Sequence, residues 1–176
     1  MHPTMARLWP GLILFSTLLY SVLRYVVFSD VLAVNIPIYV LNKAVSWSGV
    51  IYFGLSLVAR EKESRRHYGT WAFVAIVAHL IMSLMVLTPH YFAKFFAESG
   101  RMNLMGELSM LAGVVGTLFL GGLFVVNLAG KSGNGKSLRA GWGRLVLCSA
   151  AAHVAIMGYA GWLAPGAWQG YLPPIS

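Results

Sequence analysis

Long apolar stretches separated by short polar loops make up most of this chain. Five such stretches lie at residues 8–28, 36–59, 67–88, 104–128 and 142–163. An α-helix needs about 20 mostly apolar residues to cross about 30 Å of hydrocarbon. The pattern therefore predicts an all-α fold: a polytopic membrane helical bundle of about five transmembrane helices, forming a single transmembrane domain over residues 1–176.

One ionisable residue interrupts the third apolar stretch. Between the arginine pair at residues 65–66 and Pro89, no side chain is charged except, on protonation, those of His67 and His79. His79 lies near the middle of this stretch, and His153 has a similar place in the fifth. A strongly polar group inside a membrane is costly unless something satisfies it, so intramembrane histidines are candidates for a functional site.

Composition supports the membrane assignment. The 176 residues are 58% hydrophobic and only 10% charged, with mean hydropathy +0.71, whereas soluble domains carry about 25% charged residues. The lone Cys148 excludes a disulfide framework and a cysteine-based metal site. The net charge of +8 is not interpreted as nucleic-acid binding, because the basic residues lie in short loops, where they orient membrane proteins.

The distribution of lysine and arginine between the loops predicts the orientation. Nine lie in the N-terminal tail, the second–third loop and the fourth–fifth loop, against four on the opposite side. Positive charge is retained in the cytoplasm. We therefore expect the N-terminus inside and the C-terminus outside, in a multi-pass protein of the cytoplasmic (inner) membrane.

With this orientation, the two histidines share a depth. His79 precedes Pro89 by ten residues and His153 precedes Pro165 by twelve, which places each about 15–18 Å below the outer boundary at 1.5 Å per residue. Small side chains share the histidine faces: Gly69, Ala72, Ala75 and Ser83 around His79, and Gly143, Ser149 and Ala150 around His153. A flat macrocycle between helices needs such slots, and imidazole is a standard haem ligand. The alternative is that each histidine only hydrogen-bonds across the bundle.

Two segments resemble a known family. Residues 65–83, RRHYGTWAFVAIVAHLIMS, resemble the third helix of the ferric-reductase-like transmembrane family, which has a basic pair, a glycine, an aromatic–small run, and a haem-ligating histidine ten residues after the glycine. Residues 142–162, WGRLVLCSAAAHVAIMGYAGW, resemble its fifth helix with the same spacing. The family includes the haem-binding subunit of the bacterial methionine sulfoxide reductase system and the STEAP metalloreductases. The other three stretches resemble it only in hydropathy.

The resemblance implies a b-type haem with axial ligands His79 and His153, bordered by Gly69, Ala75, Ser83 and Ser149. It implies an electron-transfer subunit of an oxidoreductase rather than a complete enzyme. The fifth stretch has no second histidine, so we expect one haem instead of the two that many members stack. We expect five helices instead of six and no flavin–nicotinamide domain. Electrons would then come from quinol, a bound flavin or a flavoprotein, and would leave to an extracytoplasmic acceptor protein or metal.

Several basic residues remain as secondary candidates. Arg24 and Lys43 lie toward the outer side, where cations could meet haem propionates; Lys43 could instead reach the surface or pair with Glu107. Arg65 and Arg66, with Lys136 and Arg139, form a cytoplasmic basic rim that would contact anionic lipid, a flavin phosphate or an acidic redox partner. We place His67 at the cytoplasmic edge and His90 in an outer loop, not as ligands.

The chain also contains a phosphate-loop-like pattern, and its histidines allow a second function. Residues 130–137, GKSGNGKS, fit the phosphate-binding pattern G-x-x-x-x-G-K-[ST], but that mechanism needs a strand before the loop, and a membrane span precedes it here. The competing function is a haem-free membrane subunit or assembly factor in which the histidines only bridge helices.

Overall fold

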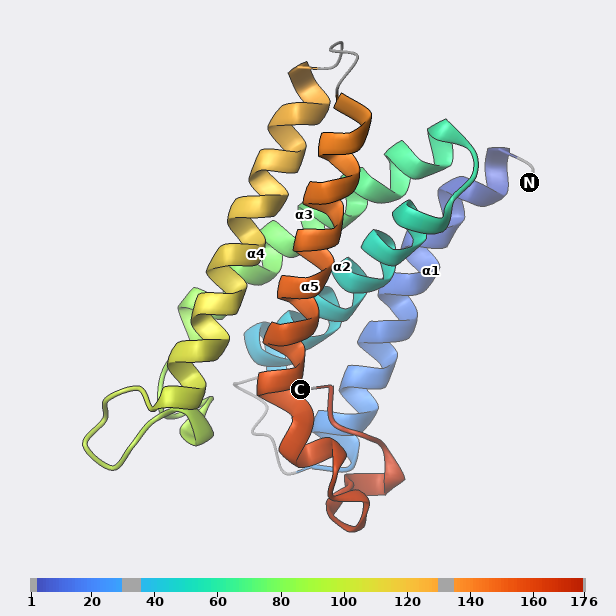
Figure 1. Ribbon diagram of the computed structural model, residues 1–176. Helices are drawn as coiled ribbons and strands as arrows, with labels where there is room; N and C mark the ends of the chain where they lie inside the picture. The colour runs from blue at the N-terminus through green and yellow to red at the C-terminus, as the bar shows by residue number, and fades with distance from the viewer. Residues whose placement is uncertain (1–2, 30–35, 130–134, 176) are drawn as a thin grey trace. The chain divides into compact units, whose positions relative to one another are not determined.

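The computed structural model describes residues 3–29, 36–129 and 135–175 (Figure 1). Within these ranges the chain is all-α, as predicted, with five long helices and no strand beyond one bridge between Phe96 and Met102. The helices are α1 (Pro3–Val22), α2 (Leu41–Val58), α3 (Lys62–Val86), α4 (Leu104–Ala129) and α5 (Gly135–Trp162). A π-helical turn, η1 (Leu23–Val27), extends α1, and another, η3 (Ile36–Val40), leads into α2.

Four segments of the described chain are long and apolar enough to span a membrane: Leu8–Val27, Lys62–Val86, Leu104–Asn127 and Gly141–Trp162. They match the first, third, fourth and fifth predicted spans. The second predicted span is helical but is not among the four. It carries Asn42 and Lys43, which are only 2% and 4% exposed. These helices support a membrane protein, while the direction of insertion stays a prediction.

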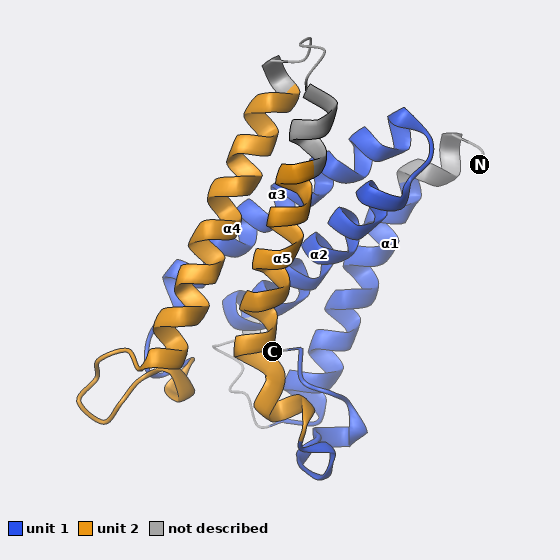
Figure 2. Ribbon diagram, viewed as in Figure 1, with its two compact units in different colours: residues 1–91, 164–175 blue, residues 92–163, 176 orange. Residues whose placement is uncertain are grey.

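The chain divides into two compact units, shown in Figure 2. Unit 1 comprises residues 1–91 and 164–175, and contains α1, α2 and α3. Unit 2 comprises residues 92–163 and Ser176, and contains α4 and α5. His79 belongs to the first and His153 to the second. The single transmembrane domain expected over residues 1–176 stays a prediction.

In unit 1, α2 and α3 form an antiparallel helical hairpin held close by small residues. A Cβ at Gly49 would lie 3.0 Å from Cγ1 of Ile76 and 3.5 Å from Cβ of Ala75, and a Cβ at Gly69 would lie 3.9 Å from Cβ of Ser56. Small side chains let two membrane helices approach this closely and gain dispersion contacts along their length. The pairing sets the register that places His79 opposite the start of α2.

In unit 2, α4 and α5 form a second antiparallel hairpin, visible side by side in Figure 1. A Cβ at Gly116 would lie 3.1 Å from Cβ of Ser149. Farther along, the Trp142 indole covers Gly122 and meets the ring of Phe119 edge-on at 5.6 Å. The glycines of α4 therefore make room for α5, which agrees with the packing expected of a glycine-rich membrane helix.

The segment between α3 and α4 contains a short 3-10 helix, η4 (Ala93–Phe95). Asn103 caps α4, since its Oδ1 accepts a hydrogen bond from the main-chain N–H of Gly106 at 3.0 Å. The Lys94 ammonium donates to the main-chain oxygen of Met157 on α5, and desolvation lowers the pKa of this lysine. These contacts fix the segment to the end of the hairpin in unit 2.

The C-terminal tail returns to unit 1 through the short helices η5 (Pro165–Ala167) and η6 (Gln169–Tyr171). Gly170 has φ +59° and lies beneath the ring of Phe28, where a Cβ would clash. Tyr20 donates to the main-chain oxygen of Pro173 at 2.6 Å, and the Trp47 indole donates to that of Ile175 at 3.0 Å. The tail thus ties α1 to α2.

Candidate functional site

His79 on α3 is hydrogen-bonded to a buried amide on α2. Its Nδ1 lies 2.6 Å from Oδ1 of Asn42, a residue only 2% exposed. Because an amide oxygen can only accept, Nδ1 carries the proton. In a neutral imidazole the lone pair is then on Nε2.

Ser83, one turn beyond His79 on the same face of α3, contacts both the Asn42 amide and the imidazole. Its Oγ accepts a hydrogen bond from Nδ2 of Asn42 at 3.1 Å and lies 3.3 Å from Nδ1 of His79. Ser83 Oγ also lies 3.4 Å from Oδ1 of Asn42 and 3.5 Å from Nε2 of His79. The serine therefore contacts both atoms of the amide, and the amide oxygen has its shortest contact with the imidazole. Three side chains from two helices thus form one polar cluster within the hairpin.

His153 on α5 has the corresponding arrangement in unit 2. Its Nδ1 donates to the main-chain oxygen of Ser109 on α4 at 2.8 Å, and Oγ of Ser109 lies 3.2 Å away. Ser109 is 2% exposed. Gly113, one turn along α4, leaves space for the ring, because a Cβ there would lie 3.3 Å from Nδ1.

The two histidines thus share one tautomer. Each donates its Nδ1 proton to an oxygen of the preceding helix, so the neutral form of each offers Nε2 as a metal donor. Histidines that bind metals usually make such a hydrogen bond through their second nitrogen, which orients the ring and raises its basicity. Each imidazole, within its own unit, thus has the hydrogen bond through its second nitrogen that is usual for a metal-binding histidine.

No protein-family model, curated protein or solved structure matches this chain. The resemblance to the ferric-reductase-like family therefore rests on residues 65–83 and 142–162 alone. It stays a prediction, as does the haem that it implies. The structure adds the hydrogen-bond partners of each histidine, Asn42 and Ser109, which do not follow from the resemblance.

The small residues predicted to border a haem all contact neighbouring helices. Ala75 and Gly69 face α2, Ser149 lies against Gly116 of α4, and Ser83 binds Asn42. Small residues serve close helix packing as readily as they serve a cofactor slot. Their assignment as haem-bordering residues stays a prediction.

Arg24 and Lys43 are buried cations within unit 1. Arg24 is 6% exposed; its guanidinium donates to Oε1 of Gln169 in the tail and lies 5.5 Å from the ring centre of Tyr25. Its Nε is buried with no hydrogen-bond partner. The Lys43 ammonium lies 5.5 Å from the ring centre of Tyr39. Lys43 is therefore held inside the unit. The alternative in which its side chain reaches the surface does not occur in this structure.

Arg65 and Arg66 are exposed at the start of α3. Arg65 donates twice to the main-chain oxygen of Ala59, through Nε at 3.3 Å and through a terminal nitrogen at 2.9 Å. This closes the turn between α2 and α3, a role that the sequence did not indicate. The side chains of Lys136 and Arg139, like residues 130–134 of the phosphate-loop pattern, lie outside the described part of the chain.

The remaining histidines have different surroundings. His67 lies among the rings of Tyr68 and Trp71, with a buried Nε2 that has no hydrogen-bond partner. His90 is exposed and stacks edge-on against Tyr91 at 4.9 Å. Over the described ranges, no group of three or more His, Cys, Asp or Glu side chains gathers to hold a metal ion. A haem iron held by two imidazoles needs no such group.

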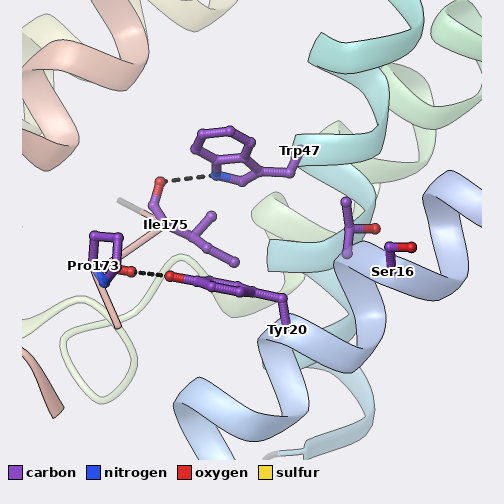
Figure 3. Close-up of a pocket in the computed structure, with 6 residues that line it drawn as sticks. Ser16, Tyr20, Trp47, Pro173 and Ile175 are labelled. Atoms are coloured by element: carbon purple, nitrogen blue, oxygen red, sulfur yellow. Dashed lines mark hydrogen bonds between the residues drawn. The ribbon is translucent and has the colours of Figure 1, made fainter. Parts of the chain in front are cut away.

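A cavity of about 250 Å³ lies in unit 1 beneath the tail (Figure 3). It is lined by Ser16, Thr17 and Tyr20 of α1, Trp47 of α2, and Pro173 and Ile175 of the tail. Thr17 Oγ1 is already hydrogen-bonded to Ser48 Oγ at 2.7 Å, and Tyr20 and Trp47 donate to the tail. With its polar groups paired, the cavity suits a hydrocarbon group and not a charged one.

Proposed function

We propose that this protein is a membrane b-type cytochrome that carries electrons across the cytoplasmic membrane through one bis-histidine haem. It would act as the haem-binding subunit of an oxidoreductase system similar to those of the ferric-reductase-like family. The observation that carries the proposal is the shared geometry of His79 and His153. Each lies within a helical hairpin and donates through Nδ1, so that Nε2 is the nitrogen that would bind iron in the neutral form.

The haem would supply one-electron chemistry when bound. The chain's own contribution would be to hold and orient the two imidazoles and to exclude water. Asn42 and Ser109, both 2% exposed, supply hydrogen-bond acceptors inside hydrocarbon-facing helices. Such fixed partners keep the rings in one orientation between oxidised and reduced states.

Arg24 and Lys43 are the proposed partners of the haem propionates. Both are buried in unit 1, and Arg24 retains a buried N–H donor at Nε with no hydrogen-bond partner. Burying a guanidinium is costly unless an anion or acceptor offsets it. A propionate carboxylate would provide that anion.

The electron donor is proposed to be quinol, a flavin or a flavoprotein, and the acceptor an extracytoplasmic protein or metal. The apolar cavity beside Tyr20 and Trp47 supports quinol, whose hydrocarbon tail it could accept. The exposed Arg65 and Arg66 support docking of a flavin phosphate or an acidic partner on the other side. The membrane itself is the remaining partner; we propose no nucleic-acid role.

A second candidate function has its own support. The hydrogen bonds of His79 and His153 each join two helices, α3 to α2 and α5 to α4. This is the arrangement expected of a haem-free membrane subunit or assembly factor in which the histidines only stabilise the hairpins. Both candidate functions involve the same hydrogen bonds through Nδ1, so the presence or absence of bound haem is what distinguishes them.

The test is the reduced-minus-oxidised absorbance spectrum of protein purified from cells that make haem. We expect the bands of a low-spin b haem at about one haem per chain. His79→Ala and His153→Ala should each remove the bis-histidine spectrum. His90→Ala, which changes an exposed histidine, should leave it intact.

Purified, folded protein that carries no haem and binds none on titration would refute the cytochrome and leave the second candidate. A normal spectrum in both ligand variants would likewise refute these ligands. Circular dichroism of each variant establishes that the helices are retained, so that loss of pigment is not mistaken for loss of fold.

A further inference from the structure

Resting on the proposed function, we infer that Asn42 sets the electron-donating strength of His79 and through it the redox potential of the haem. Asn42 is a positioning residue: its amide oxygen contacts the imidazole and not the iron. The corresponding acceptor for His153 is the main-chain oxygen of Ser109. His153 also has the hydroxyl of Ser109 at 3.2 Å from Nδ1, but its shorter contact, at 2.8 Å, is to a main-chain oxygen that no substitution removes.

The first step is the strength of the contact. The Nδ1–Oδ1 distance of 2.6 Å is shorter than the 2.8 Å between His153 and Ser109, and lies at the short end for an N–H···O hydrogen bond. Asn42 is 2% exposed, so bulk water does not compete for its oxygen. In a low-dielectric interior such a bond is stronger than in water.

The second step is the fixed direction of the amide. An asparagine beside a histidine could present either its oxygen or its nitrogen. Here Ser83 Oγ accepts from Nδ2 at 3.1 Å and lies 3.4 Å from Oδ1, while the oxygen makes its shorter contact, at 2.6 Å, with the ring. Ser83, four residues after His79 on the same helical face, acts on the imidazole through Asn42 and also contacts the ring directly, at 3.3 Å from Nδ1.

The third step is the effect on a metal. An acceptor that draws the Nδ1 proton toward itself raises electron density at Nε2. A more basic ligand stabilises the oxidised iron over the reduced iron and lowers the midpoint potential. Removing the acceptor should raise that potential, and replacing it with a carboxylate should lower it.

The experiment compares Asn42→Leu with Asn42→Asp by redox titration of the purified haem protein. Leucine matches asparagine in size but cannot accept the proton, so we expect a higher midpoint potential. Aspartate strengthens the acceptor, so we expect a lower one. General loosening of the hairpin would shift the midpoint potential of both variants in the same direction. Opposite shifts from the two substitutions would therefore point to the hydrogen bond itself.

Ser83→Ala and Ser109→Ala provide matched serine variants. Ser83→Ala removes the group that accepts from the amide nitrogen, so its potential should shift toward that of Asn42→Leu. Ser109→Ala removes the hydroxyl near His153 but keeps its main-chain acceptor, so it should shift the potential less than Ser83→Ala does. Ser46→Ala, a serine of α2 that bonds its own helix at the main-chain oxygen of Lys43, serves as the control for helix perturbation.

A second readout is the low-spin ferric electron paramagnetic resonance signal, which responds to the imidazolate character of the axial ligands. Potentials within error of wild type in both Asn42 variants, with full haem content, would overturn the inference while leaving the cytochrome intact. Absence of haem in the wild-type protein would instead refute the proposed function.

Discussion

A single carbonyl oxygen beside each imidazole is the smallest feature on which the candidate site depends. The sequence identified both histidines, because an ionisable residue in an apolar helix is conspicuous. It did not identify Asn42 or Ser109 as their partners. Those pairings depend on the register of two hairpins, which hydropathy does not encode. The signal that could have found them is a polar residue near the start of the preceding apolar stretch.

Gly113 provides a test at this scale. A Cβ at this position would lie 3.3 Å from Nδ1 of His153, so Gly113→Ala should push the ring from Ser109. We expect weaker haem retention, measured as haem per chain after dialysis. Gly121 on the same helix has nothing within 4 Å of its added Cβ. Gly121→Ala should therefore retain haem fully, and equal loss in both variants would contradict the explanation.

At the scale of elements, the apolar pattern predicted all five helices. Their C-terminal ends agree with the prediction to within two residues when η1 is counted with α1, whereas α1, α2, α3 and α5 begin five to seven residues from the predicted starts. The pattern also placed a span over residues 36–59, where the structure has a π-helical turn followed by the 18-residue α2. This helix turns Asn42, Lys43, Ser48 and Ser56 toward the interior. Its polar residues make contacts within unit 1. The same residues lower the mean hydropathy of this segment, and α2 is not among the candidate membrane spans.

The pairing of α1 with α2 offers a prediction at this scale. Tyr52, 2% exposed, donates its hydroxyl proton to the main-chain oxygen of Pro10. Tyr52→Phe removes the donor and should cost about 1–3 kcal/mol, because a buried acceptor loses its partner. Thermal unfolding in detergent measures the loss, with Tyr159→Phe as the control because Tyr159 is exposed. Equal stability of the two variants would show that the contact contributes nothing.

At the scale of the whole molecule, charge and hydropathy predicted a multi-pass membrane protein, and four long apolar helices support it. They did not predict that the chain divides into two units. Nor did they predict the return of the tail to α1 and α2. Both depend on long-range contacts of individual side chains, such as Trp47 with Ile175, which a composition rule does not contain.

The predicted orientation can be tested in intact cells. In a Cys148→Ser background, Lys62→Cys and Ser99→Cys place one thiol in each of two opposite loops, at exposed positions. The excess of lysine and arginine near residue 62 predicts a cytoplasmic location for that loop. A membrane-impermeant maleimide should label the residue 99 variant in intact cells and the residue 62 variant only after lysis. The reverse pattern would invert the topology.

The return of residues 164–175 to unit 1 affects the order in which the protein can mature. The ribosome produces α1, α2 and α3 first, but the segment that accepts the protons of Tyr20 and Trp47 follows α5. Until that segment emerges, a phenol and an indole of the first unit lack their final acceptors. The first unit can therefore complete these two hydrogen bonds only after α4 and α5 have been translated.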